Sequence, residues 1–201
     1  MPFIGNKPTA VPLTGADIQD GTIGIADLSA TGTKDSTTFL RGDNTFNTPP
    51  LGGITEADQW RLTANITSDT SPITSNLERV DNTGFGYIGT GMSVSSGIWT
   101  FPSTGIYLIR AIGGYQPISG DNVVIDITIT TNNSSYTQVA VADETGSTTS
   151  AKSMCEFLFD VTDTANCKVK FNAFSIASGS VIFGNTNRND THFTFIRLGD
   201  T

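Results

Sequence analysis

Residues 98–116 read IWTFPSTGIYLIRAIGGYQ, and this stretch indicates the local structure more clearly than any other in the chain. Two runs rich in aromatic and aliphatic residues, 98–101 and 106–115, flank the segment from Pro102 to Gly105. Aromatic and β-branched residues favour strands, whereas Pro and Gly interrupt them. The stretch therefore predicts a strand, a turn and a second strand.

Alternating apolar residues continue this pattern toward the C-terminus. In residues 123–130 every second side chain is apolar and polar side chains such as Asp126 lie opposite, which predicts a half-buried strand. MCEFLFDV (154–161) and CKVKF (167–171) alternate in the same way, and TDTAN between them predicts a hairpin turn. THFTFIRL (191–198) is apolar on both faces, so we expect a strand buried on both sides.

Several further strands complete the predicted head, residues 59–201. Weaker candidates lie at 64–66 and 85–88, and clearer ones at 136–142 and 181–183. Short strands at this spacing, without a long helical pattern, are typical of an all-β sandwich or jelly roll.

Residues 1–58 differ from the head because they contain too few apolar residues for a core and many Gly and Pro residues. We expect an extended arm that does not fold alone. Its few, spaced apolar residues suit contact with other copies of the arm or with a partner surface. We therefore interpret the arm as an attachment device. The predicted attachment residues are Phe3, Ile4, Ile18, Ile23, Ile25, Leu28, Phe39, Leu40 and Phe46.

Charge and hydropathy argue against two classes of partner. The formal net charge is −8, whereas binding to a nucleic-acid backbone needs clustered Lys and Arg. No apolar run approaches the ~20 residues of a membrane-spanning helix. The opening MPFIGNKPTAVPL lacks the features of a secretory signal, so we expect a soluble protein made in a cytoplasm.

Residues that could carry chemistry have simpler structural explanations. The single histidine, His192, lies in a predicted strand without a second histidine for a metal cluster, and no nucleophile elbow is present. Asp143 and Glu144 fit a solvated loop better than a glycosidase pair. Calcium at Asp160 with Asp163, or at Asn189 with Asp190, lacks EF-hand spacing. We therefore predict no enzymatic activity, no cofactor and no metal.

Cys155 and Cys167 lie in neighbouring predicted strands, and the favoured hairpin register places Cys167 opposite Asp160. We interpret both as buried free thiols, with a disulfide as the alternative. Arg41, Gly42 and Asp43 form an integrin-like tripeptide that a simple turn explains.

Six aromatic residues could form a sugar-binding platform, although aromatics at strand spacing usually belong to a core or an interface. These residues are Tyr107, Tyr115, Phe174, Phe183, Phe193 and Phe195. Receptor contacts are expected instead in loops at the tip. The candidate loops are 117–122, 143–151 and 184–190.

The stretch 98–116, with Phe101, Pro102, Gly105 and Tyr107, resembles the globular heads of the C1q and tumour necrosis factor superfamily. FLFDVTDTANCKVKF (157–171) and FGNTNRNDTHFTFIRL (183–198) resemble the paired strands and the C-terminal strand of that family. The resemblance implies a ten-stranded jelly roll that assembles as a homotrimer. The residues assigned to its trimer core are Phe101, Tyr107, Phe157, Phe159, Phe193 and Phe195.

The arm resembles linker segments of virion proteins from tailed bacteriophages. The resemblance lies in MPFIGNKP, GADIQDGTIGIADLSATGT (15–33) and STTFLRGDNTF (36–46), and the arm has no collagen-like Gly-X-Y period. Together the two resemblances imply a non-enzymatic trimeric virion protein, made in the bacterial host cytoplasm. Its arm would bind capsid or tail proteins, and its head would decorate the particle or contact a host-surface glycan or protein.

Three alternatives remain open at this point: a cement protein that only stabilises the shell, a polysaccharide depolymerase, and a secreted bacterial C1q-like lectin. A head lying flat on the shell would favour the first. An acidic groove with two carboxylates at glycosidase separation would favour the second. A cleaved leader or a disulfide would favour the third.

Overall fold

The computed structural model describes residues 24, 29–49, 52–146 and 149–201, which fall into two units, Met1–Gly52 and Gly53–Thr201. Within these ranges every regular element is a strand, and no helix is long and apolar enough to cross a membrane. Six predicted attachment residues lie outside the described residues. They are Phe3, Ile4, Ile18, Ile23, Ile25 and Leu28.

The described part of the first unit contains a small hairpin of β1 (Phe39–Leu40) and β2 (Phe46–Asn47). The tripeptide that ends at Asp43 occupies the connection between these strands. The Asp43 carboxylate accepts hydrogen bonds from the backbone N and Oγ1 of Thr45, at 3.1 and 2.7 Å. These bonds fix the turn, as the sequence predicted for this tripeptide.

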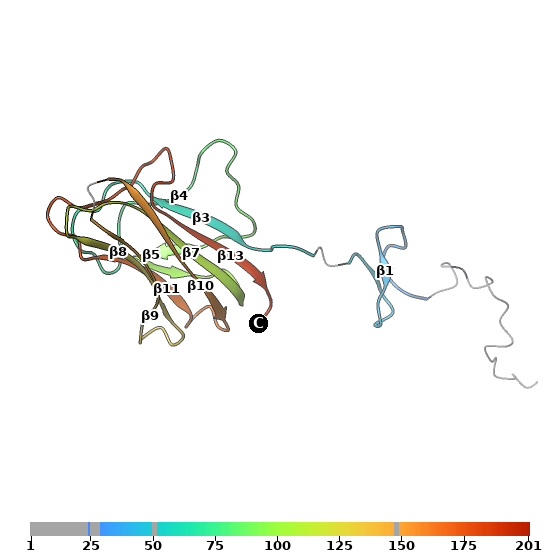
Figure 1. The fold of residues 1–201 in the computed structure, drawn as a ribbon. Helices are drawn as coiled ribbons and strands as arrows, with labels where there is room; N and C mark the ends of the chain where they lie inside the picture. The colour runs from blue at the N-terminus through green and yellow to red at the C-terminus, as the bar shows by residue number, and fades with distance from the viewer. Residues whose placement is uncertain (1–23, 25–28, 50–51, 147–148) are drawn as a thin grey trace, which may run out of the picture. The chain divides into compact units, whose positions relative to one another are not determined.

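The second unit is a sandwich of two antiparallel sheets (Figure 1). The first sheet has the order β10-β7-β13-β3-β4, and β12 also pairs with β7. Its strands are β3 (Ala57–Leu62), β4 (Leu77–Arg79), β7 (Gly105–Gln116), β10 (Ala151–Val161), β12 (Val181–Ile182) and β13 (His192–Gly199).

The second sheet has the order β5-β6-β11-β8-β9. Because the chain passes repeatedly from one sheet to the other, most neighbours within a sheet are distant in sequence. This antiparallel arrangement confirms the predicted all-β jelly-roll sandwich. The strands of this sheet are β5 (Ser93–Ser95), β6 (Ile98–Thr100), β8 (Asn122–Thr130), β9 (Thr137–Thr145) and β11 (Lys168–Phe174).

The predicted hairpin between residues 154–161 and 167–171 is wrong. Strand β10 pairs with β7 in the first sheet, and β11 pairs with β6 and β8 in the second, because the chain changes sheets after Val161. Cys155 and Cys167 are nevertheless buried and free, as expected. Burial, with a smaller contribution from Asp126, raises the pKa of the Cys155 thiol to about 12, so the thiol is protonated at neutral pH.

The sequence did not predict β3 and β4, in which charged residues such as Arg61 and Glu78 alternate or mix with apolar ones. The expected strands at 64–66 and 85–88 are reduced to single bridges at Ile66 and Ile88. In β3 the fully buried Arg61 forms ion pairs with Glu78 and Asp81, and these partners permit burial of its charge. The charged residues weaken the alternating apolar signal in strands as short as these.

Strand β8 is buried on both faces, whereas the sequence predicted one buried face. Asp126 is 3% exposed. Its Oδ1 accepts hydrogen bonds from Asn172 Nδ2 at 2.7 Å and Thr128 Oγ1 at 3.1 Å, and its Oδ2 accepts one from Gln138 Nε2 at 2.7 Å. Because these donors come from β8 and from both neighbouring strands, the carboxylate links three strands of the second sheet.

We expect the substitution Asp126→Ala to lower the free energy of unfolding by about 3 kcal/mol, because the buried Asn172 amide would lose its carboxylate acceptor. Guanidinium denaturation followed by tryptophan fluorescence measures this change. Asp160→Ala, at an exposed position of β10, is the control and should leave the midpoint nearly unchanged. Equal midpoints for both variants would contradict the role assigned to Asp126.

Candidate association face

The first sheet has one face that points away from the sandwich and carries aliphatic side chains. In β7 and β10 buried residues alternate with more exposed ones, because successive side chains of a strand point to opposite faces. We call the outward aliphatic residues of this sheet the association face. They are Ile106, Leu108, Ile112, Met154, Leu158 and Ile196.

The strand register aligns these side chains across the sheet. Leu158 is opposite Leu108, which is opposite Ile196, so these three form one apolar row. Met154 is opposite Ile112 in a second row. Leu158 is 59% exposed and Met154 53% exposed, values unusual for aliphatic side chains that adjoin other aliphatic side chains on a sheet.

A polar row separates the two apolar rows. It contains Glu156, Arg110, Thr194 and Gln59, which are neighbours across β10, β7, β13 and β3. Arg110 Nη2 lies 2.9 Å from Glu156 Oε2, and Gln59 Nε2 donates a hydrogen bond to Thr194 Oγ1 at 2.9 Å. These contacts pair the polar side chains with one another between the aliphatic rows.

No protein-family model matches the sequence, and comparison with curated proteins gives no match. Solved structures do match. Murine APRIL aligns with a TM-score of 0.53 at 10% identity, over 71% of this chain and 98% of its own. Eiger TNF from S. frugiperda aligns with a TM-score of 0.53 at 10% identity, over 72% of this chain and 93% of its own. The head has the C1q/TNF fold. The globular domain of zebrafish complement 1qA aligns with a TM-score of 0.51 at 8% identity, over 73% of this chain and 99% of its own.

The aromatic residues assigned to the trimer core lie inside the C1q/TNF-like head of a single chain. Phe101, Tyr107, Phe159, Phe193 and Phe195 are at most 3% exposed, and Phe157 packs against the same core. Within one chain these side chains form part of the core between the two sheets, and their assignment to a trimer core stays a prediction. Sequence reasoning missed the outward aliphatic residues, although IYLIRAI and THFTFIRL are visibly apolar on both faces.

The six aromatic residues considered for a sugar-binding platform do not form one exposed surface. Tyr107, Tyr115, Phe193 and Phe195 are buried in the core, as the favoured interpretation expected. Burial raises the pKa of Tyr115 above its usual range, and its hydroxyl donates a hydrogen bond to Ala142 O at 3.1 Å. The side chains of Phe174 and Phe183 are half-buried.

The carboxylates considered for catalysis lie in a strand, and two of those considered for calcium binding make local contacts instead. Asp143 and Glu144 are successive residues of β9, not loop residues as predicted. Asp163 Oδ1 accepts a hydrogen bond from Ala165 N at 2.7 Å in a turn, and Asp190 pairs with Arg188. Among the described residues, no group of His, Cys, Asp or Glu could hold a metal ion.

His192 lies in β13 at the end of the association face. Its register partners are Ile112 in β7 and Arg61 in β3. Its Nδ1 is buried and has no hydrogen-bond partner among the residues that the structure describes. Burial, followed by the charges of Lys152 and Arg110, lowers the pKa of the imidazole below 6.5. The ring is therefore neutral at neutral pH.

We expect the stability of the head to fall as the pH drops below 6.5, the ordinary pKa of histidine, toward the lowered folded-state pKa of His192. In this window the unfolded chain binds a proton that the folded chain does not bind. His192→Gln should remove this part of the pH dependence. Urea midpoints at several pH values from 7.5 downward measure it, and identical wild-type and variant profiles would contradict the prediction.

Proposed function

We propose that the chain is a non-enzymatic homotrimeric structural protein of a bacteriophage virion. Its C1q/TNF-like head associates through the association face, and its N-terminal arm attaches the trimer to the capsid or tail. The observation that carries the proposal is the row of exposed aliphatic side chains that contains Leu158. An apolar sheet face of this kind, exposed on a single chain, is typical of a surface covered by a partner.

A second and third copy of the chain are the partners that best fit this face. The resemblance to C1q and tumour necrosis factor heads implies three copies around one axis. Burying the aliphatic rows would contribute about 25 cal/mol for each Å² of apolar surface. The interface expected for such an obligate assembly is at least about 2,000 Å² in total. Trimerisation would then be a condition of full stability.

The Arg110–Glu156 pair supports a specific packing of the copies. Charged groups within an apolar contact must remain paired, since an unpaired buried charge costs several kcal/mol. This pair is already formed within one chain, at 2.9 Å. The copies can therefore cover it without breaking it, and its position between the apolar rows would define their register.

We expect Leu158→Asp to convert the trimer to smaller species, because it places a charge in the larger apolar row. Light scattering coupled to gel filtration should give three times the chain mass of 21.2 kDa for the wild type and a lower mass for the variant. Val141→Asp is the matched control, since Val141 is 45% exposed but lies on β9 of the other sheet. A folded monomeric wild type would refute trimerisation.

The exposed hairpin of the first unit supports the attachment role of the arm. Phe39 and Leu40 are each 43% exposed on a two-stranded hairpin, which is too small to bury them itself. Phe46, the third described attachment residue, is half-buried opposite Leu40. The likeness of this arm to phage linker segments supports a virion protein as its binding partner.

We expect the double substitution Phe39→Asp and Leu40→Asp to reduce the copy number of the protein in purified particles, while the oligomeric mass of the free protein stays unchanged. Quantitative mass spectrometry of particles measures the copy number. Thr37→Asp and Thr38→Asp, placed beside the hairpin strand, test whether added charge alone has the same effect. Absence of the wild-type chain from particles would overturn the virion role.

Electron cryo-microscopy of the same particles distinguishes the forms of the virion role. Density on the tail with projecting heads supports a fibre or adhesin. Density on the shell with projecting heads supports a head fibre or decoration, and heads lying flat between capsomers support the cement alternative.

A further inference from the structure

We propose that a pocket at one end of the head binds a carboxylated sugar ring at the terminus of a surface polysaccharide. This inference deepens the host-contact part of the proposed function. The pocket has a volume of about 290 Å³. It is lined by Gly114, Ser150, Ala151, Lys152, Phe183, Arg188 and Asp190.

The pocket lies at the end of the first sheet remote from Ala57, the first residue of β3. Strand β3 begins at Ala57, opposite Ile196, and reaches His192 through its antiparallel pairing with β13. In the neighbouring strands β7 and β10, Gly114 and Lys152 are paired and lie beyond the level of His192. Ser150 from the predicted tip loop 143–151, and Arg188 and Asp190 from the predicted tip loop 184–190, therefore line one pocket.

Hydrogen bonds fix the walls of this pocket to the first sheet. Phe183 N donates to Gly114 O at 2.8 Å, and Gly114 N donates to Thr191 Oγ1 at 3.0 Å. Lys152 Nζ donates to Asn189 O at 3.1 Å, which connects β10 to the loop that carries Arg188. The aromatic and cationic side chains thus project from backbone that is held in place before a ligand arrives.

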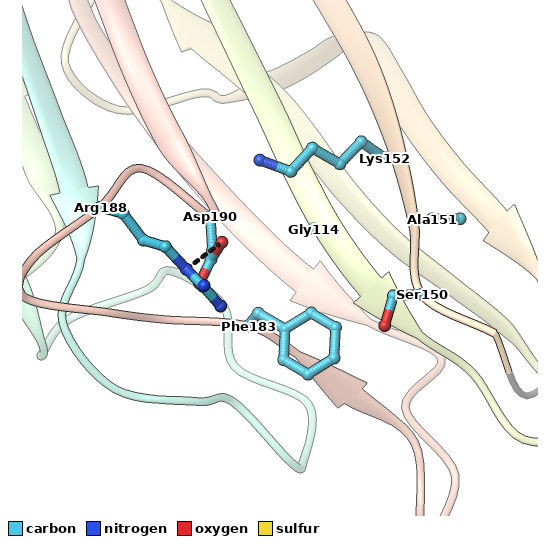
Figure 2. Close-up of a pocket in the computed structure, with 7 residues that line it drawn as sticks. All are labelled: Gly114, Ser150, Ala151, Lys152, Phe183, Arg188 and Asp190. Carbon is cyan, nitrogen blue, oxygen red and sulfur yellow. Dashed lines mark hydrogen bonds and ion pairs between the residues drawn. The ribbon is translucent and has the colours of Figure 1, made fainter.

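Figure 2 shows the side chains of Lys152, Arg188, Phe183 and Ser150 arranged around Gly114. Gly114 lies at the floor of the pocket, and its lack of a side chain lets the Asp190 backbone approach it closely. A Cβ atom added there would lie 3.0 Å from Asp190 O and 3.7 Å from Phe183 Cδ2. The phenyl ring of Phe183 forms an apolar wall beside this floor.

The charges of the pocket favour an anionic ligand. Lys152 and Arg188 are cationic and Asp190 is the single carboxylate among the lining residues, within a chain of formal net charge −8. Asp190 contacts Arg188 through Nε, at 3.0 and 2.9 Å, and the guanidinium carries four further N–H donors. The Lys152 ammonium has three donors, of which one reaches Asn189 O. Both cations can therefore donate to an added carboxylate.

The combination of groups fits a sugar better than an acidic peptide. The face of an aromatic ring is negatively polarised and attracts the C–H groups on the apolar side of a pyranose ring. Asp190 and Ser150 can accept hydrogen bonds from ring hydroxyls, while Lys152 and Arg188 hold the carboxylate. The volume of about 290 Å³ is at the lower limit of small-ligand sites, which restricts the ligand to one or two rings.

The test is a ligand-observed NMR titration of the full-length protein with three acidic probes, disaccharides that end in glucuronate, galacturonate or N-acetylneuraminate. Neutral disaccharides that end in glucose or galactose are the reference. We expect at least one acidic probe to bind, and the neutral sugars to bind about tenfold more weakly, as expected for the loss of a charged hydrogen bond.

Single variants then locate the site. Lys152→Gln, Arg188→Gln and Phe183→Leu should each weaken binding of the acidic probe by about tenfold. Lys170→Gln is the matched control, because Lys170 lies on β11 of the other sheet, beside Tyr136. Equal binding of acidic and neutral sugars, binding only of a glutamate-rich peptide, or unchanged binding in Lys152→Gln and Arg188→Gln would overturn the proposal.

The oligomeric mass of each protein, measured on the same samples, separates this inference from the proposed function. A trimer that binds none of the acidic probes overturns the sugar site and leaves the trimeric virion role in place. Binding by a folded monomer overturns trimerisation and supports the sugar site.

Discussion

The packing around Trp99 joins the two sheets of the head. This fully buried ring, on β6, has its centroid 5.1 Å from those of both Trp60 on β3 and Phe195 on β13. Phe171 and Phe193, one from each sheet, stack beside it at 4.1 Å. Large aromatic side chains supply most of the apolar area that closes a sandwich. The inward faces of both sheets, and therefore the outward position of every other side chain, follow from this contact.

The outward faces of the two sheets differ in the kind of side chain they carry and in how far those side chains are buried within one chain. On the second sheet Asp126 and Asn172 are buried and hydrogen-bonded within one chain. On the first sheet Leu158 and Met154 remain more than half exposed. Polar groups can be satisfied locally by neighbouring strands, whereas aliphatic groups leave water only when another surface covers them. For this reason the first sheet is the face that we assign to self-association.

The proposed association face and the proposed sugar pocket occupy separate parts of the same sheet. The aliphatic rows occupy its centre, and the pocket around Gly114 lies beyond His192, where the strands give way to loops. A rigid sheet that presents loops at its end is a common arrangement for binding sites. Three copies of a weak site on one trimer would strengthen attachment to a repetitive polysaccharide through multivalency.

The sequence by itself determined the all-β class, the strands from Ile98 onward and the buried free thiols, because alternating apolar residues report burial directly. It could not locate β3, where the charge of Arg61 is compensated by partners about 20 residues away along the chain. Nor could it show that β10 and β11 belong to different sheets, or which of two apolar faces points outward. Those features depend on which strands become neighbours, and long-range pairing is decided only when the sandwich closes around Trp99.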